Sequence, residues 1–155
     1  MKRVLFIDLR NTSRSQMAEA WFNQFALGWG EARSCGTMPA QSSDPFTVTV
    51  MAEAGIDIRQ AKPQAVNQRL LSHSELVVIM GPDVYPHAFN PTHIWDFLDP
   101  TGESIVHYRI QRDAIRQRVQ ELVMEMHTGS EYGKFDPTTA ALLQSQLMIE
   151  YQLFR

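Results

Sequence analysis

Cysteine is almost absent from this chain: among 155 residues there is one, Cys35. A single thiol cannot form a disulfide within the chain, and it cannot pass electrons along a series of cysteines. The sequence therefore excludes a disulfide-stabilised fold and thiol-relay redox chemistry. Cys35 lies on a predicted strand, where we expect it to be a small buried hydrophobic residue.

The chain also lacks a block of like charge, since 14 Lys and Arg stand against 17 Asp and Glu, for a formal net charge of −3. Nucleic acid is therefore not expected as a partner. The apolar run at residues 4–7 is too short for a signal peptide or a membrane span, so we expect a cytoplasmic protein. The five histidines show no metal-ligand spacing, and we predict no metal site from them and no cofactor.

Periodic apolar residues are abundant, and at 44% hydrophobic the chain can bury one sizeable core. Buried strands are predicted at residues 4–7, 32–37, 75–80 and 93–97, and amphipathic helices at residues 15–27, 43–55 and 104–126. This alternation predicts an α/β fold of the flavodoxin-like type, with a four-stranded parallel sheet flanked by helices. We expect this domain to span residues 1–128, with functional residues in loops at the carboxyl ends of the strands.

Residues 129–155 are predicted to form a linker and an additional C-terminal helix. Asp136-Pro137 is a helix-start pair, and Leu143, Leu147 and Tyr151 recur at four-residue spacing. Such an apolar helix needs a partner: its own domain, the groove of another protein, or the same helix in a homodimer. We favour the homodimer, because two-fold self-association is the commonest soluble assembly.

The loop after the first predicted strand carries a signature. Residues 5–20 have the sequence LFIDLRNTSRSQMAEA. Together with blocks at residues 32–37, 51–57, 75–80 and 95–100, this segment resembles the low-molecular-weight tyrosine phosphatases and the thiol arsenate reductases built on the same fold. The resemblance covers roughly residues 3–126. These families place a cysteine at the end of the first strand, then five residues, then arginine and serine. Here Asp8 stands at the cysteine position, and Arg14 and Ser15 keep theirs.

The resemblance implies a phosphate-binding P-loop, in which backbone N–H groups, a helix N-terminus and Arg14 surround an oxyanion. Its other members would be Leu9, Arg10, Asn11, Thr12, Ser13 and Ser15. Asn11 is expected to hold a left-handed backbone conformation, which asparagine tolerates. Asp99, which precedes a proline, matches the aspartate that protonates the leaving group in these families.

A carboxylate at position 8 changes what this loop can do, because it is itself an anion. We expect Asp8 to accept loop N–H groups and to form an ion pair with Arg14. A phosphate within about 4 Å of Asp8 would meet about 4 kcal/mol of repulsion per unit charge at an effective dielectric near 20. Thiol-based arsenate reduction is excluded, because position 13 and residues 80–82 hold no second cysteine.

A cation site is a further implication of the resemblance. Asn11, Glu19 and Ser34 match positions at which some arsenate reductases bind potassium. The acidic fourth residue of that site is not evident near Gln64.

Two functions of different classes remain open, and the leading hypothesis is a catalytically degenerate protein that acts as a binding or regulatory module. The alternative is a phosphatase or phosphotransfer enzyme in which Asp8 forms an acyl-phosphate or, with Asp99, holds a divalent cation. Leu9 and Arg10 follow Asp8, so it lacks the acidic neighbour that Mg²⁺ sites usually recruit. A third interpretation is an engineered replacement of a natural cysteine. The partner would be an unidentified protein, a second copy of the chain, or a small oxyanion.

Overall fold

A parallel β-sheet lies at the centre of the structure, a computed structural model that describes residues 1–128. Its strands, in the spatial order β2-β1-β3-β4, are β1 (Lys2–Asp8), β2 (Gly30–Gly36), β3 (Leu76–Ile79) and β4 (His93–Ile94). β1 pairs with both β2 and β3, and its residues 4–7 are almost fully buried. This confirms the predicted strand with two covered faces.

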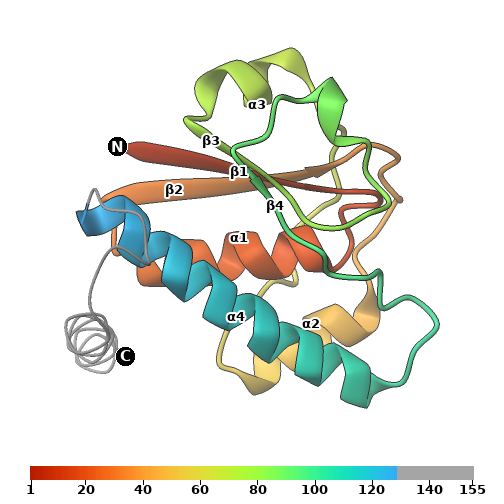
Figure 1. The fold of residues 1–155 in the computed structure, drawn as a ribbon. Helices are drawn as coiled ribbons and strands as arrows, with labels where there is room; N and C mark the ends of the chain where they lie inside the picture. Colours follow the sequence, from red (N-terminus) through yellow and green to blue (C-terminus); the bar gives the residue numbers. More distant parts are fainter. Residues whose placement is uncertain (129–155) are drawn as a thin grey trace.

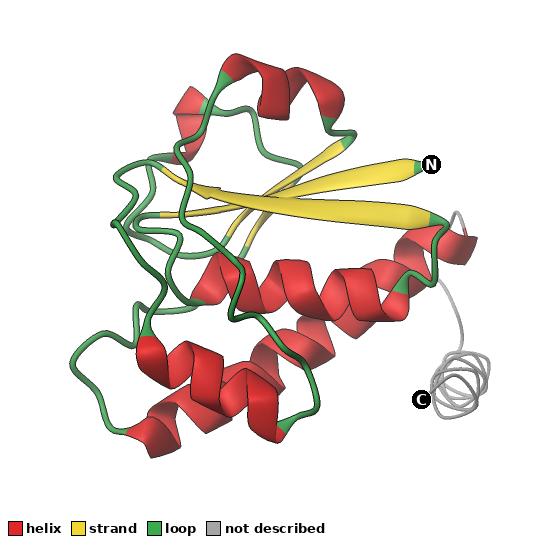
Figure 2. Ribbon diagram, turned by 180° about the vertical axis from the view of Figure 1, so that it is seen from behind, coloured by secondary structure: helices red, strands yellow, loops and turns green. Residues whose placement is uncertain are grey.

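Helices cover both faces of the sheet (Figures 1 and 2). On one face lie α1 (Arg14–Phe25), α2 (Pro45–Glu53) and α4 (Ile105–Thr128), and on the other lie α3 (Gln68–His73) and the short 3-10 helix η1 (Pro86–Ala88). The predicted fold class, a four-stranded parallel sheet flanked by helices, is confirmed. α3 and η1 were not predicted, because neither has a fully buried residue that would give a periodic apolar pattern.

Two apolar clusters fill the space between the layers. The larger one joins β1 to α1 and α4 through residues such as Phe6, Trp21 and Tyr108. The smaller one lies under α3 and includes Leu5 and Cys35. Cys35 is 0% exposed, and burial, with added repulsion from Asp8 and Glu19, raises the pKa of its thiol to about 12. The prediction that Cys35 is a buried hydrophobic residue is confirmed.

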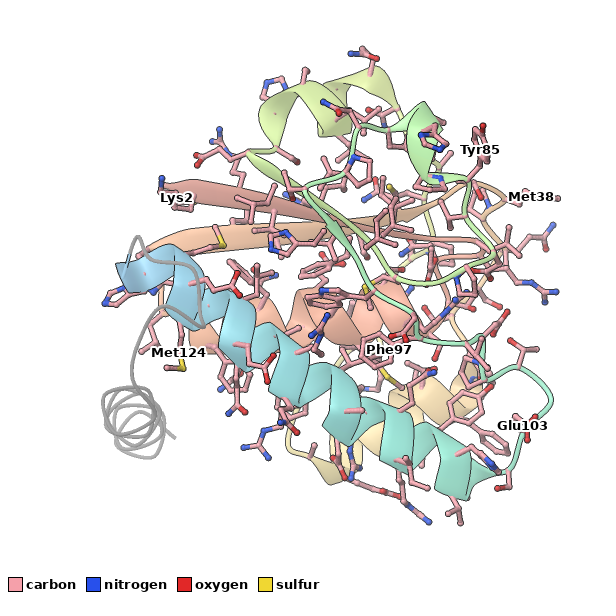
Figure 3. All side chains as sticks on the ribbon, viewed as in Figure 1. Lys2, Met38, Tyr85, Phe97, Glu103 and Met124 are labelled. Atoms are coloured by element: carbon pink, nitrogen blue, oxygen red, sulfur yellow. The ribbon has the colours of Figure 1, made fainter. Side chains whose placement is uncertain are left out.

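The loops that follow the strands gather at the carboxyl edge of the sheet. Figure 3 shows Met38 and Tyr85 at this edge, with Lys2 at the opposite one. Within residues 1–128, no helix is both long and apolar enough to cross a membrane. The helix predicted from Asp136 lies outside the described residues, so the division of the chain near residue 128 stays a prediction.

Candidate anion-binding site

Asp8, the last residue of β1, lies inside the loop that leads to α1. Its side chain is buried, and the residue is 2% exposed. Oδ1 accepts a hydrogen bond from the N–H of Asn11 at 2.6 Å, and Oδ2 accepts one from the N–H of Ser15 at 2.9 Å. The prediction that loop N–H groups hold Asp8 is confirmed.

The charge state of Asp8 is set by opposing effects. Burial raises the pKa of this carboxyl above its ordinary value, because the charged form is poorly solvated inside the protein. Hydrogen bonds from Ser15, the positive charge of Arg14 and the N–H of Asn11 favour the carboxylate and offset part of that rise. Asp8 is therefore a carboxyl that accepts a proton more readily than one in water.

Four carbonyl groups of the loop backbone are paired with the segment that follows β2. The carbonyls of Asp8, Leu9, Arg10 and Thr12 accept hydrogen bonds from the N–H groups of Thr37, Met38, Ala40 and Asp44, in that order. Asn11 has φ 56°, which confirms the predicted left-handed conformation. Gly36 permits this packing, since a Cβ there would lie 2.7 Å from the carbonyl oxygen of Leu9.

The N–H groups of the same loop are left as donors. Those of Leu9, Arg10, Thr12, Ser13 and Arg14 donate to no acceptor in residues 1–128. The last three of these residues are buried. A buried polar group without a partner costs about 1–3 kcal/mol, so several of them in one loop are unusual outside a binding site. These donors are available to an oxyanion.

Arg14 does not pair with Asp8, and that prediction was wrong. Its Nη1 donates to Asp83 Oδ1 at 2.9 Å, and its Nη2 donates to Asp83 Oδ2 at 2.6 Å. Nη1 also donates to the carbonyl of Phe97 at 2.8 Å. Asp83 follows β3, which lies beside β1, so the sheet brings together residues 69 apart in sequence. Spacing along the chain gave no signal for this pair.

Asp83 orients the guanidinium of Arg14 without using all of its donors. Three of the five N–H bonds go to Asp83 and Phe97, and the Nε–H and one Nη2–H have no acceptor among the described residues. Burial lowers the pKa of Arg14, but Asp83 and Asp8 raise it more, so the side chain stays charged. Gly81 leaves the space this requires, because a Cβ there would lie 2.2 Å from Nη1.

Asp99, the predicted proton donor, is near enough to the loop for Arg14 and Arg10 to affect its ionisation. Its Oδ1 accepts hydrogen bonds from the N–H and the hydroxyl of Thr101, at 3.0 and 2.7 Å. Burial raises the pKa of Asp99, but these hydrogen bonds and the two arginine charges lower it by more than burial raises it. The pKa of Asp99 is therefore below its ordinary value. In this structure Asp99 is therefore an ionised acceptor.

The three residues of the predicted potassium site lie together. Asn11 Nδ2 donates to the hydroxyl of Ser34, which donates to Glu19. Gln64 donates its N–H to Asn11 Oδ1 and its side-chain amide to the Ser34 carbonyl, both at 2.9 Å. The oxygens of Asn11 and Ser34 are thus already paired, and the potassium site stays a prediction. Over residues 1–128 there is no group of three or more His, Cys, Asp or Glu that could hold a metal ion.

Two residues that support the loop were missed by sequence reasoning. Gln16 donates to the Asn11 carbonyl at 2.7 Å, and the hydroxyl of Thr47 donates to that of Ser13 at 2.8 Å. Gln16 is buried on α1, and Thr47 is buried on α2. A polar residue at a buried helical position is the signal that could have found them.

A strand, a loop with several N–H groups that have no acceptor in residues 1–128, and a helix that begins with arginine lie at the carboxyl edge of a parallel sheet. This arrangement is typical of an α/β protein of the phosphatase class. The chain belongs to the low molecular weight phosphotyrosine protein phosphatase family, whose model matches residues 3–131.

The similar proteins include arsenate reductases. One from Bacillus cereus is 32% identical over 126 residues, which cover 77% of this chain and 92% of the relative. One from Staphylococcus epidermidis is 31% identical over 125 residues, covering 77% and 94%.

Among solved structures, an arsenate reductase in the phosphate binding state is 28% identical with a TM-score of 0.72, covering 81% of this chain and 98% of that one. The YwlE arginine phosphatase from Geobacillus stearothermophilus shares the fold at 23% identity and a TM-score of 0.74, covering 83% and 95%.

Proposed function

We propose that this chain is a cytoplasmic member of the family that has given up thiol chemistry and acts as a binding or regulatory module. In this proposal Asp8 takes the place of the catalytic cysteine, and the loop of residues 8–15 retains its capacity to bind a small oxyanion. The carboxylate sets when the loop binds, because its charge opposes that of the ligand.

The observation that carries the proposal is the division of donors within the loop. Asp8 uses the N–H groups of Asn11 and Ser15, while those of Leu9, Arg10, Thr12, Ser13 and Arg14 have no acceptor in the described part of the chain. The anion-binding half of the loop is thus present beside a carboxylate. Cys35, the one thiol, is buried and has a pKa of about 12, so it cannot replace a reactive thiolate at neutral pH.

Turnover of phosphate esters through Asp8 is the second candidate function. Its support is the placement of a carboxylate among free donors and a charged Arg14. Asp99 argues against it. An ester leaving group needs a proton, and the lowered pKa of Asp99 together with its hydrogen bonds from Thr101 disfavours the protonated form that would supply it. We therefore favour binding over ester hydrolysis.

A calorimetric titration with sulfate tests the proposal. We expect wild type to bind sulfate weakly at neutral pH and Asp8→Ala to bind it at least about tenfold more tightly, since about 1.4 kcal/mol of repulsion is worth a factor of ten. Arg14→Ala in the Asp8→Ala background should abolish binding. Asp113→Ala, which removes an exposed carboxylate on α4, is the control and should match wild type. Equal affinities of wild type and Asp8→Ala would contradict the proposal.

A further inference from the structure

We propose that Asp8 is a covalent modification site: one of its carboxylate oxygens accepts the phosphoryl group of an acyl phosphate, and the aspartyl-phosphate is the regulated state of the module. This inference rests on the proposed function, because the same loop must bind the phosphoryl oxygens. It adds a substrate class and a mode of regulation.

The nucleophile is held in place and keeps a reactive lone pair. Asp8 accepts hydrogen bonds from the N–H groups of Asn11 and Ser15, and a hydrogen bond from the Ser15 side chain also favours the carboxylate. A carboxylate has about four acceptor positions, so one lone pair of the group remains unused. These hydrogen bonds fix the orientation of the group without occupying it fully, which is the arrangement that an attacking oxygen needs.

The groups that would bind the phosphoryl oxygens are the hydrogen-bond donors of the loop and of Arg14. Five loop N–H groups and two N–H bonds of Arg14 have no acceptor in residues 1–128. Asp83 and the Phe97 carbonyl hold the guanidinium from behind, so it does not have to be ordered when a phosphoryl group arrives. Preorganised donors of this kind stabilise the charge on the equatorial oxygens during phosphoryl transfer.

The chemistry of the site selects the donor. Thr101 donates two hydrogen bonds to Oδ1 of Asp99, and the pKa of this carboxyl is lowered, so protonation of a leaving group by Asp99 is disfavoured. An acyl phosphate needs none, because its leaving group departs as a carboxylate. An Asp8 oxygen forms a bond to phosphorus, the bond from phosphorus to the acyl oxygen breaks, and its electron pair leaves with the released carboxylate. One mixed anhydride replaces another, so the transfer needs no further reactant.

The phosphoryl group would alter the surface beside the loop. Its oxygens would accept the two N–H bonds of Arg14 that Asp83 and Phe97 leave unused, and Asp83 belongs to the segment after β3 that also carries Tyr85. Tyr85 is 71% exposed at the carboxyl edge of the sheet, as is Met38 (Figure 3). The added negative charge would therefore lie at the edge that carries these exposed side chains, which are suited to partner recognition.

Acetyl phosphate is the probe. Full-length protein is incubated with it, and intact mass spectrometry should show one added phosphoryl group that neutral hydroxylamine removes. Acetyl groups on lysine resist hydroxylamine and are distinguished in that way. The label should be lost in Asp8→Asn and kept in the control Asp113→Asn. Borohydride reduction of labelled wild type, followed by peptide mapping, should place the modification at position 8 even if Asp8→Asn fails to fold.

Absence of a hydroxylamine-sensitive label in wild type, or a label that maps to another residue, would overturn the inference. The sulfate titration separates the two proposals. If Asp8→Ala binds sulfate and wild type is not labelled, the modification fails while the proposed function stands. If neither wild type nor Asp8→Ala binds sulfate, the proposed function fails as well.

Discussion

Asp8 is almost completely buried, and hydrogen bonds from Asn11 and Ser15 favour its charged form. Sequence comparison places an aspartate at this position, but it does not give the balance between burial and hydrogen bonding, which depends on the three-dimensional surroundings. That balance decides whether the loop repels or admits an anion. The behaviour of this single residue as pH changes is therefore a direct test of the electrostatic argument.

Sulfate binding by wild type should strengthen as pH falls. Burial raises the pKa of Asp8, so the carboxyl takes up its proton above the pH at which a solvated aspartate does. Below that pKa the repulsion is gone, and above it the full carboxylate opposes the ligand. Titrations from about pH 8 to about pH 5, a range in which sulfate remains a dianion, would measure the trend.

The control for this pH dependence is Asp8→Ser, which has no titrating group at position 8. Its sulfate affinity should vary much less with pH than that of wild type. A wild-type affinity that is independent of pH, or one that rises with pH, would show that the charge of Asp8 does not govern binding.

At the scale of elements, the sequence was sufficient to predict β1, α1 and α4. β1 has a continuous apolar run, and each of the two helices has apolar residues at helical spacing. The sequence was insufficient where a long-range contact decides the structure. The fourth strand was predicted over residues 93–97 but ends at Ile94. Phe97 still donates its N–H to the Met80 carbonyl, but its own carbonyl is taken by Arg14. The Phe97 carbonyl thus binds Arg14 instead of taking part in a strand. This contact joins residues far apart in sequence, so the local sequence pattern could not predict it.

Gly81 is the residue on which this arrangement of loops depends. A methyl group at Gly81 would lie 2.2 Å from Arg14 Nη1 and 2.3 Å from the Phe97 carbonyl oxygen. We expect Gly81→Ala to displace the guanidinium, to lower the free energy of unfolding by about 1–3 kcal/mol, and to weaken sulfate binding in the Asp8→Ala background by about tenfold. Chemical denaturation and calorimetry would measure the two effects.

Gly55→Ala is the matched control for Gly81→Ala. Gly55 has φ +83°, but a Cβ there meets nothing within 4 Å. The substitution should cost stability through backbone strain and leave sulfate binding unchanged. If Gly81→Ala binds sulfate as its parent does, the guanidinium is not held as described.

On the scale of the whole molecule, the family model ends at residue 131, whereas the chain continues to residue 155. The match to the family lies within residues 3–131, and the apolar tail sequence begins beyond it. The tail is the segment for which the sequence predicts association.

Deletion of residues 134–155 should convert a dimer into a monomer and leave the domain folded. The physical reason is that the tail pattern has a broad apolar surface with few charges, which favours pairing with an identical helix. Light scattering would give the mass, and circular dichroism would check the fold. A full-length protein that is already monomeric at high concentration would contradict the predicted homodimer.

We propose that a carboxylate has replaced the thiol of this loop and ended its thiol chemistry. The sharpest test is to assay the purified full-length protein for aryl phosphatase activity and for dithiothreitol-dependent arsenate reduction. We expect no turnover above a heat-inactivated sample in either assay. Turnover of either substrate that is lost in Asp99→Asn would contradict the proposal, because a working proton donor requires a working nucleophile.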